Sequence, residues 1–256
     1  MVIGAIQNLN KIVKERVMEF NEFLQMLVFD AKKIGISIDE QRADTFYKYM
    51  QQLLEWNEKI NLTAITEPKD IILKHFIDSI TIEKYIKKNA KVVDIGTGAG
   101  FPGIPLASIR KDVDITLMDS LNKRIKFLNE VIAKNNLSHV MAVHGRAEEL
   151  AISNEYREQF DIATSRAVAS LNVLLEYMLP FVRVGGYCIC MKGANIEEEK
   201  ENSKRALELL GGTIEKIDSF VLPNTEFGRS VVIVKKIGST PKKYPRKAGT
   251  PAKEPL

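Results

Sequence analysis

An apolar strand that ends at Asp94 turns through three closely spaced glycines, Gly96, Gly98 and Gly100, and then enters a helix. Glycine lets the backbone approach a ligand without a Cβ in the way, and the N-terminus of the next helix offers unpaired N–H donors. Nucleotide-like cofactors are bound by such strand–turn–helix units. The segment Gly96–Gly103, named the glycine turn here, therefore predicts a cofactor site that includes Asp94 and the three glycines.

The residue types permit two classes of cofactor. Gly98 to Gly103 matches the dinucleotide pattern G-x-G-x-x-G, so an NAD(P)-dependent oxidoreductase is one interpretation. In a dinucleotide site, however, the first glycine directly follows the strand, whereas here Gly96 already occupies the turn. Asp94 would repel a pyrophosphate at short range but would suit the sulfonium and ammonium groups of S-adenosylmethionine. These observations favour S-adenosylmethionine.

A second acid, Asp119, ends the apolar run 113–118, which predicts the next strand along the chain. Asp119 lies roughly 20 residues beyond the glycines, a position from which a carboxylate accepts hydrogen bonds from ribose hydroxyls in nucleotide-binding folds. Alternatively, Asp119 caps the helix predicted from Leu121 to Asn135. The context of two neighbouring strands favours the ribose role, which both cofactor classes share.

From Lys91 onward, short apolar runs alternate with helical segments. Strands are predicted at 92–95, 113–118, 139–144, 160–165, 186–192, 213–221 and 230–236, with one connecting helix at 170–183 and another near 195–210. Crossovers of about a dozen residues or more predict parallel strands, whereas the short connection 222–229 predicts an antiparallel hairpin at the sheet edge. The expected α/β fold has six parallel strands and one antiparallel strand, which is similar to the Rossmann-like sheet of class I methyltransferases.

The chain divides into three predicted segments. Residues 1–88 form an N-terminal helical region, because apolar residues recur at spacings of three and four. His75 falls on an apolar helix face there and is interpreted as a core histidine. Residues 89–237 form the S-adenosylmethionine-binding methyltransferase domain, and residues 238–256 form a basic, Pro-rich tail.

The tail carries as much net charge as the whole chain. Five cations, Lys242, Lys243, Arg246, Lys247 and Lys253, stand against Glu254, a net of 5 − 1 = +4, and the chain's formal charge is also +4. A basic segment suits a polyanion such as RNA. A solubilising, partly disordered terminus is the equally weighted alternative.

Composition excludes several classes of protein. With 45% hydrophobic and 27% charged residues in 256, the chain is typical of globular proteins. No apolar run approaches a membrane span, and charges interrupt the N-terminus where a signal peptide needs an apolar core. Cys188 and Cys190 share one face of a predicted strand and are interpreted as buried thiols. We expect no metal, no disulfide, no membrane, a cytoplasmic location and a monomer.

An ordered set of motifs covers most of the chain from Leu53 to the C-terminus. The segments are Trp56–Thr63, His75–Ser79, the glycine turn through Pro105, Met118–Ser120, Gly145–Glu148, Ser165–Val168, Arg229–Val232 and Tyr244–Lys247. In these segments the chain resembles the glucose-inhibited division protein B family, bacterial methyltransferases (methyltransferase G) that modify N7 of a guanine in small-subunit (16S) ribosomal RNA. The resemblance implies cofactor contacts at Gly96, Phe101, Ala147, Glu148 and Arg166.

Transfer to guanine N7 requires alignment rather than a base, because N7 carries a lone pair and no proton. Arg166 and Lys192 follow the fourth and fifth predicted strands, at the edge where ligands bind. If the last strand is antiparallel, its start lies at the same edge, which brings Arg229 and the loop Asn224–Gly228 to the mouth of the site. We expect these three residues to position RNA through its phosphates, with Arg166 stacking on the target base. Ordinary solvation of a strand end is the alternative for Lys192 and Arg229.

The expected partner is small-subunit ribosomal RNA or a subunit particle. A non-catalytic RNA-binding or ribosome-assembly factor that retains the cofactor fold is the alternative from another functional class. A methyltransferase for small molecules or proteins is also possible, but it gives no reason for the basic tail.

Overall fold

The computed structural model describes residues 18–256, and the part of the predicted helical region before residue 18 lies outside the described residues. A seven-stranded sheet has the order β3-β2-β1-β4-β5-β7-β6. Its strands are β1 Lys91–Ile95, β2 Asp114–Asp119, β3 Val140–His144, β4 Phe160–Arg166, β5 Val182–Gly193, β6 Gly212–Val221 and β7 Gly228–Lys236. Only β7 runs antiparallel to its neighbours among these strands. The predicted sheet of six parallel strands and one antiparallel strand is confirmed.

The fifth strand begins earlier than the sequence predicts, and the preceding helix ends earlier. Helix α9, Leu171–Met178, gives way to a short 3-10 turn at Leu179–Phe181, because Pro180 cannot continue an α-helix. Val182 then pairs with Phe160 before the register shifts. The predicted helix to residue 183 and the strand start at 186 are therefore wrong by a few residues.

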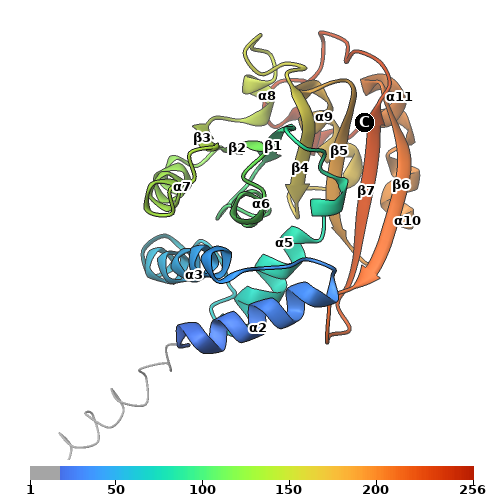
Figure 1. Cartoon of the computed structure of the whole chain (residues 1–256). Helices are drawn as coiled ribbons and strands as arrows, with labels where there is room; N and C mark the ends of the chain where they lie inside the picture. Colours follow the sequence, from blue (N-terminus) through green and yellow to red (C-terminus); the bar gives the residue numbers. More distant parts are fainter. Residues whose placement is uncertain (1–17) are drawn as a thin grey trace, which may run out of the picture.

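Two helical layers lie on opposite sides of the sheet (Figure 1). One layer holds α6 Gly103–Ile109 and α7 Asn122–Lys134, covered in turn by α2 Phe20–Lys33 and α3 Glu40–Ile60. The other holds α8 Ala147–Leu150, α9, α10 Glu197–Asn202 and α11 Lys204–Leu210. Successive side chains of β1 point to opposite faces of the sheet. Val92 therefore packs into the hydrophobic core on one face and Val93 into the core on the other.

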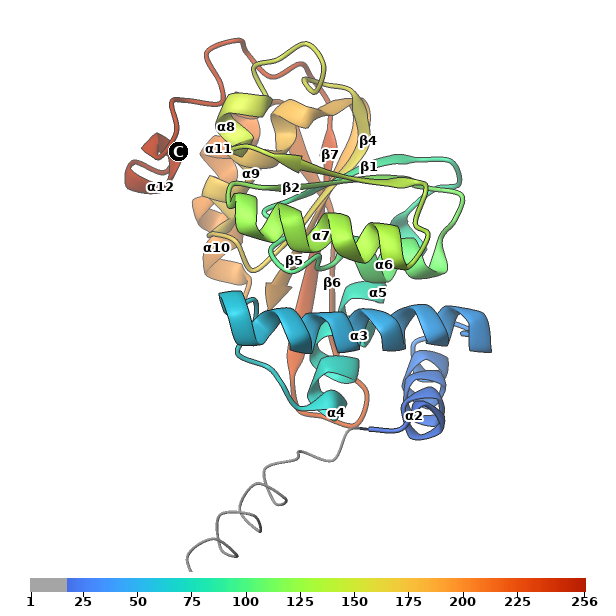
Figure 2. The same ribbon diagram turned by 90° about the vertical axis from the view of Figure 1, so that its left-hand side faces the viewer.

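The N-terminal helices pack directly on the strand–turn–helix unit. Helix α3 crosses beneath α6 and α7 (Figure 2). The hydroxyl of Tyr49, which is fully buried, donates to the carbonyl of Ala99 in the glycine turn, and Trp56 Nε1 donates to Glu130 of α7 at 3.1 Å. After α3 the chain forms α4 Pro68–Asp70, the π-helix η1 Ile71–Ile77, α5 Asp78–Ile80 and the 3-10 turn η2 Glu83–Tyr85. This continuous helical segment reaches the sheet edge at which β4 ends.

The tail packs against the second helical layer and ends in α12, Thr250–Lys253. Arg246 makes an ion pair of 2.6 Å with Glu176 of α9, whose side chain is only 1% exposed. Arg157 donates to the carbonyls of Thr240 and Tyr244 at 2.7 and 2.9 Å. The interpretation of this segment as a partly disordered terminus is therefore wrong, and Arg246 is occupied within the protein. The three-segment division of the chain stays a prediction.

Within the described residues, no helix is both long and apolar enough to cross a membrane. Cys188 and Cys190 are free and buried, as predicted, and burial raises the pKa of Cys190 to about 12.

The Arg246–Glu176 pair yields a stability prediction. Arg246→Ala leaves a buried carboxylate without its partner, which we expect to lower the free energy of unfolding by about 3 kcal/mol. Lys247→Ala removes the same charge from an exposed neighbour and should change stability little. Urea unfolding of both variants measures the difference, and equal stabilities would show that the Arg246–Glu176 pair contributes nothing to the fold.

Candidate functional site

The glycine turn follows β1 with three left-handed residues, Gly96, Gly98 and Gly100, at φ +67°, +62° and +102°. Asp94 is fully buried beneath the turn. One oxygen of its carboxylate accepts from Thr97 Oγ1 at 2.7 Å and from the N–H of Gly103 at 2.9 Å. Asp94 therefore braces the turn from below, since the N–H at the start of α6 requires an acceptor. The other oxygen of this carboxylate is buried and has no hydrogen-bond partner among the described residues. The expected contact between Asp94 and a cationic cofactor stays a prediction.

A pocket of about 470 Å³ opens above the turn, and we name it the donor pocket. Its lining residues are Leu62, Thr63, His75, Gly96–Ala99, Phe101, Asp119, Ser120, Arg124 and Arg166–Val168. Asp119 lines it from the end of β2 and accepts from the N–H of Gly98 at 3.0 Å and of Leu121 at 2.9 Å. The second bond ties Asp119 to the start of α7. Asp119 therefore lines the pocket, as the ribose interpretation expects, and it also accepts a hydrogen bond at the start of the next helix, as the alternative expects.

Ala147 and Glu148 do not line the donor pocket. They form the first turn of α8, beyond the end of β3. The Glu148 carboxylate accepts from the backbone N–H of Gly249 in the tail at 3.0 Å. Their predicted role in cofactor binding stays a prediction.

A larger cavity of about 990 Å³ adjoins the donor pocket, and we name it the acceptor cavity. Four cationic side chains that line it are Lys74, Arg166, Lys192 and Arg229. The three predicted substrate-positioning residues are thus brought together, and Lys74 joins them. The two spaces share His75, Arg166, Ala167 and Val168 as a common wall.

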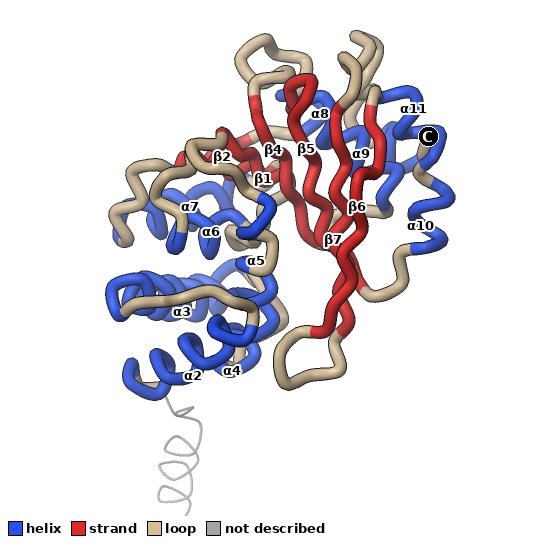
Figure 3. The backbone as a smooth tube through the Cα atoms, turned by 45° about the vertical axis from the view of Figure 1, so that its right-hand side comes forward, coloured by secondary structure: helices blue, strands red, loops and turns tan. Residues whose placement is uncertain are grey.

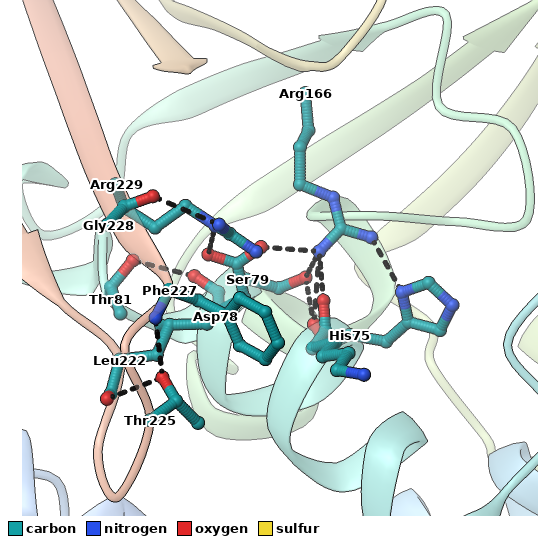
Figure 4. Close-up of polar contacts among 11 residues, drawn as sticks. His75, Asp78, Ser79, Thr81, Arg166, Leu222, Thr225, Phe227, Gly228 and Arg229 are labelled. Atoms are coloured by element: carbon teal, nitrogen blue, oxygen red, sulfur yellow. Dashed lines mark hydrogen bonds and ion pairs between the residues drawn. The ribbon is translucent and has the colours of Figure 1, made fainter. Parts of the chain in front are cut away.

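Asp78 holds two of these cations together (Figure 4). Its carboxylate accepts from Arg166 Nη1 at 3.2 Å and from Arg229 Nε at 3.1 Å. Arg166 also donates to the carbonyl of Lys74 at 3.1 Å and to His75 Nδ1 at 3.1 Å. Its side chain is 13% exposed, against 26% for Arg229. Arg166 is therefore a structural link between β4 and η1. Its predicted contacts with a phosphate and with the target base stay predictions.

Lys192 is similarly enclosed. Its ammonium group pairs with Glu199 at 2.6 Å and donates to the carbonyl of Ala169, with only 7% of the side chain exposed. The Lys192 ammonium group therefore holds the loop after β4 in place. It is not simply solvated at the end of a strand, which was the alternative interpretation.

His75 is buried, as the sequence predicts, but it also forms part of the site. Its ring stacks on Phe101 with centroids 4.3 Å apart and lines both cavities. Burial, reinforced by the charge of Arg166, lowers the pKa of His75 to about 3. Because arginine can only donate, Nδ1 accepts from Arg166 and the Nε2 proton is directed to Thr63 Oγ1, 2.8 Å away. His75 is a neutral wall residue between the two cavities.

The sequence contained a signal for His75 and Asp78 in the segment His75–Ser79, which carries part of the family resemblance. Without knowledge of where the helix docks, its periodicity indicated only a buried face. Contacts with β4 and β7 give the segment its role at the site.

S-adenosylmethionine fits the donor pocket. A Cβ placed on Gly98 would meet only the carbonyl oxygen of Gly96, at 4.0 Å, so the backbone there faces open space. Both cations that line the pocket, Arg124 and Arg166, are paired with carboxylates, so neither is free for a pyrophosphate. Phe101 and Leu62 supply apolar surface. These features suit a nucleoside with a cationic sulfur better than a dinucleotide.

Among residues 18–256, no cluster of three or more His, Cys, Asp or Glu side chains is arranged to hold a metal ion. The expectation of no metal stays a prediction.

Comparison with known proteins supports the methyltransferase interpretation. A solved structure, that of PH0793 from Pyrococcus horikoshii, matches with a TM-score of 0.52 and 16% identity over 63% of each chain, which indicates a shared fold. Ribosomal RNA small subunit methyltransferase G of Acetivibrio thermocellus is 54% identical over 91% of this chain and 96% of that protein. The Clostridium tetani protein of the same name is 52% identical over 87% of this chain and 94% of its own length. A family model described as rRNA small subunit methyltransferase G matches residues 42–227. The chain therefore belongs to the rRNA small subunit methyltransferase G (GidB) family.

Proposed function

We propose that the protein transfers a methyl group from S-adenosylmethionine to N7 of a guanine in 16S small-subunit ribosomal RNA. The observation that carries this proposal is the common wall of the two cavities at His75, Arg166, Ala167 and Val168. A donor and an acceptor bound on either side of one wall can meet at its rim, as a single in-line displacement requires. Family membership supports this reaction over the oxidoreductase alternative.

S-adenosylmethionine supplies a methyl group already activated by its positively charged sulfur. The chain's task is to hold donor and acceptor in line, because guanine N7 has a free lone pair and no proton to lose. We assign cofactor binding to the glycine turn with Phe101, Asp119 and the rim residue Arg166, to the first turn of α8 at Ala147 and Glu148, and to Asp94 through its support of the turn.

The neutral state of His75 matters to this chemistry. The donor carries a positive charge, and methylation makes the product base cationic. A protonated imidazole in the common wall would repel both, whereas the neutral ring, whose pKa is about 3, does not. Glu199 likewise balances Lys192, and the single charge of Asp78 is shared by Arg166 and Arg229, so the positive charge of these cations is partly offset where the methyl group moves.

We assign RNA positioning to the acceptor cavity. Arg229 and Lys74 are its most accessible cations, each with 26% of its side chain exposed. Each pairs with a carboxylate, Arg229 with Asp78 at 3.1 Å and Lys74 with Asp70 at 2.9 Å, and we assign phosphate contacts to their exposed parts. Arg166 and Lys192 position the loop after β4. A cytoplasmic monomer acting on ribosomal RNA or a subunit particle is the form we propose.

Labelled methyl transfer tests the function. We expect the label to enter 16S ribosomal RNA at a single guanine and chemical cleavage specific for N7-methylguanine to map it. Label in an exocyclic amine would contradict the proposed acceptor atom. Cofactor binding without transfer to RNA or subunit particles would favour a non-catalytic assembly factor.

The two acids of β2 form a matched pair for cofactor binding. Asp119 lies in the donor pocket and Asp114 is exposed at the opposite end of the same strand. Asp119→Asn should weaken S-adenosylmethionine binding roughly 10- to 100-fold, the usual effect of removing a hydrogen bond to a charged group. Asp114→Asn should bind as the wild type does. Calorimetric titration compares them, and equal affinities would remove Asp119 from the binding site.

The pKa of His75 predicts a pH dependence of folding. With an unfolded value of 6.5 and a folded value of about 3, the unfolded chain binds the extra proton, so stability is lost as pH falls below 6.5. From pH 7.5 to 5 the loss attributable to His75 should be about 2 kcal/mol. Burial raises the pKa of Asp94 to about 6, which has the opposite sign, so the effect must be measured as a difference.

Urea unfolding of wild type and His75→Gln at both pH values gives that difference. We expect the stability advantage of the wild type to shrink by about 2 kcal/mol at pH 5. An unchanged advantage would mean that His75 is not held neutral.

A further inference from the structure

One aromatic side chain of the acceptor cavity is exposed to solvent. Phe227 lines the cavity and is 45% exposed, although a phenylalanine gains most free energy from burial. In the view of Figure 4 its ring lies between Arg229 and His75, in front of Asp78. An exposed ring in a cavity lined by cations is a feature of proteins that bind single-stranded nucleic acids, where bases stack on aromatic faces.

The loop that carries Phe227 is held in a fixed shape. Leu222 is buried and its N–H donates to the carbonyl of Phe227 at 3.0 Å. Thr225 Oγ1 accepts from the N–H of Phe227 at 3.0 Å and donates to the carbonyl of Leu222 at 3.0 Å. These bonds close the loop on itself, so Phe227 is presented on a preorganised support, which lowers the entropic cost of binding.

Helix α2 anchors the same loop from outside. The loop between β6 and β7 extends past the sheet toward α2 and α4 (Figure 3). Asn224 donates to Asp30 at 3.0 Å and accepts from Lys33. The loop therefore cannot fold back to bury Phe227 without breaking contacts with the N-terminal helices.

Charge and volume indicate what the ring binds. Lys74 Nζ lies 5.0 Å from the ring centroid, and Arg229 lines the same cavity, so the ring shares the cavity with two accessible cations. The acceptor cavity of about 990 Å³ is about twice the donor pocket of about 470 Å³, which we assign to a whole nucleoside-containing cofactor. The acceptor cavity therefore has room for more than the target base alone.

We propose that Phe227 is a positioning residue that stacks on the base next to the target guanine, in an unpaired RNA segment of at least two nucleotides. The phosphate that joins the two nucleotides lies near Lys74 and Arg229. A guanine that enters the site must leave its stack, and side chains can reach N7 only outside the deep major groove of an RNA helix. Stacking on Phe227 replaces the contact that the neighbouring base loses. This inference rests on the proposed function and specifies its substrate as single-stranded RNA.

Three substitutions at one position separate stacking from simple apolar contact. Phe227→Ala removes the ring, Phe227→Leu keeps an apolar side chain without a ring, and Phe227→Trp keeps an aromatic face. Filter binding of the full-length protein to deproteinised 16S ribosomal RNA gives the dissociation constant, and methyl transfer gives KM and kcat. We expect Ala and Leu to raise the dissociation constant and KM roughly 5- to 150-fold, the usual effect of losing one stacked base, and Trp to restore them. S-adenosylmethionine affinity should stay unchanged in all three.

Phe29 provides the matched control. It is 59% exposed and has Lys33 Nζ 4.3 Å from its ring centroid, but it does not line the acceptor cavity. Phe29→Ala should bind RNA as the wild type does. An equal loss for Phe29→Ala would show that any exposed ring on this side contributes, and would overturn the specific role of Phe227.

A spectroscopic readout is independent of methylation. In a short single-stranded RNA with one guanine beside 2-aminopurine, fluorescence is already quenched by stacking on the guanine. Once the guanine leaves that stack, 2-aminopurine should be held against the ring in wild type and Phe227→Trp but should be unstacked in Phe227→Leu, so its fluorescence in the complex should be higher for Phe227→Leu. RNA binding and fluorescence that are the same in wild type and Phe227→Leu would overturn this inference while the proposed function stands. Failure of the wild type to methylate RNA would instead contradict the proposed function, whatever the binding results.

Discussion

The carboxylate of Asp78 is the point on which the site depends. It lies in the chain 88 residues before Arg166 and 151 before Arg229, and it pairs with both while only 4% exposed. Three segments, the η1–α5 helix, the end of β4 and the start of β7, are fixed to one another there. A buried acid between two arginines is stable only when both partners remain, because an unpaired buried charge is costly. The two ion pairs of Asp78 also keep the residues of the wall between the two cavities in one arrangement.

The polar groups around this carboxylate form one system. Arg166 reaches His75 and Asp78, and His75 in turn reaches Thr63 and stacks on Phe101. Donor-side and acceptor-side residues are therefore connected through hydrogen bonds and ring contacts rather than only by the sheet. Most charges in this system are compensated within it, which is what a reaction between a cationic donor and a base that becomes cationic requires.

Local sequence chemistry predicted that the glycine turn and Asp119 lie together on the donor side, whereas Ala147 and Glu148 do not line the donor pocket. The glycine turn and Asp119 belong to adjacent parallel strands, so their meeting follows from topology alone. The acceptor side was harder to predict from the sequence. The strand ends that bear Arg166, Lys192 and Arg229 were predicted, but their partners Asp78 and Glu199 lie on helices, and no local sequence pattern specifies where those helices dock. The burial of His75 was predicted, but its place between the two cavities was not, since periodicity marks a buried face without saying what covers it. The position of the loop that bears Phe227 at the mouth of the site was predicted from the antiparallel hairpin, whereas the exposure of the Phe227 ring depends on how that loop is anchored.

The anchoring of that loop by Asn224 to Asp30 has a consequence for how such a protein can diversify. We assign the cofactor to segments that follow strands of the central sheet, whereas the loop between β6 and β7 and helix α2 contact each other at the rim of the site. A change in the length of this loop or in the sequence of α2 can alter which substrate groups the rim contacts, while the segments assigned to the methyl donor stay the same. An ancestral enzyme with this layout can acquire new targets by altering its periphery alone.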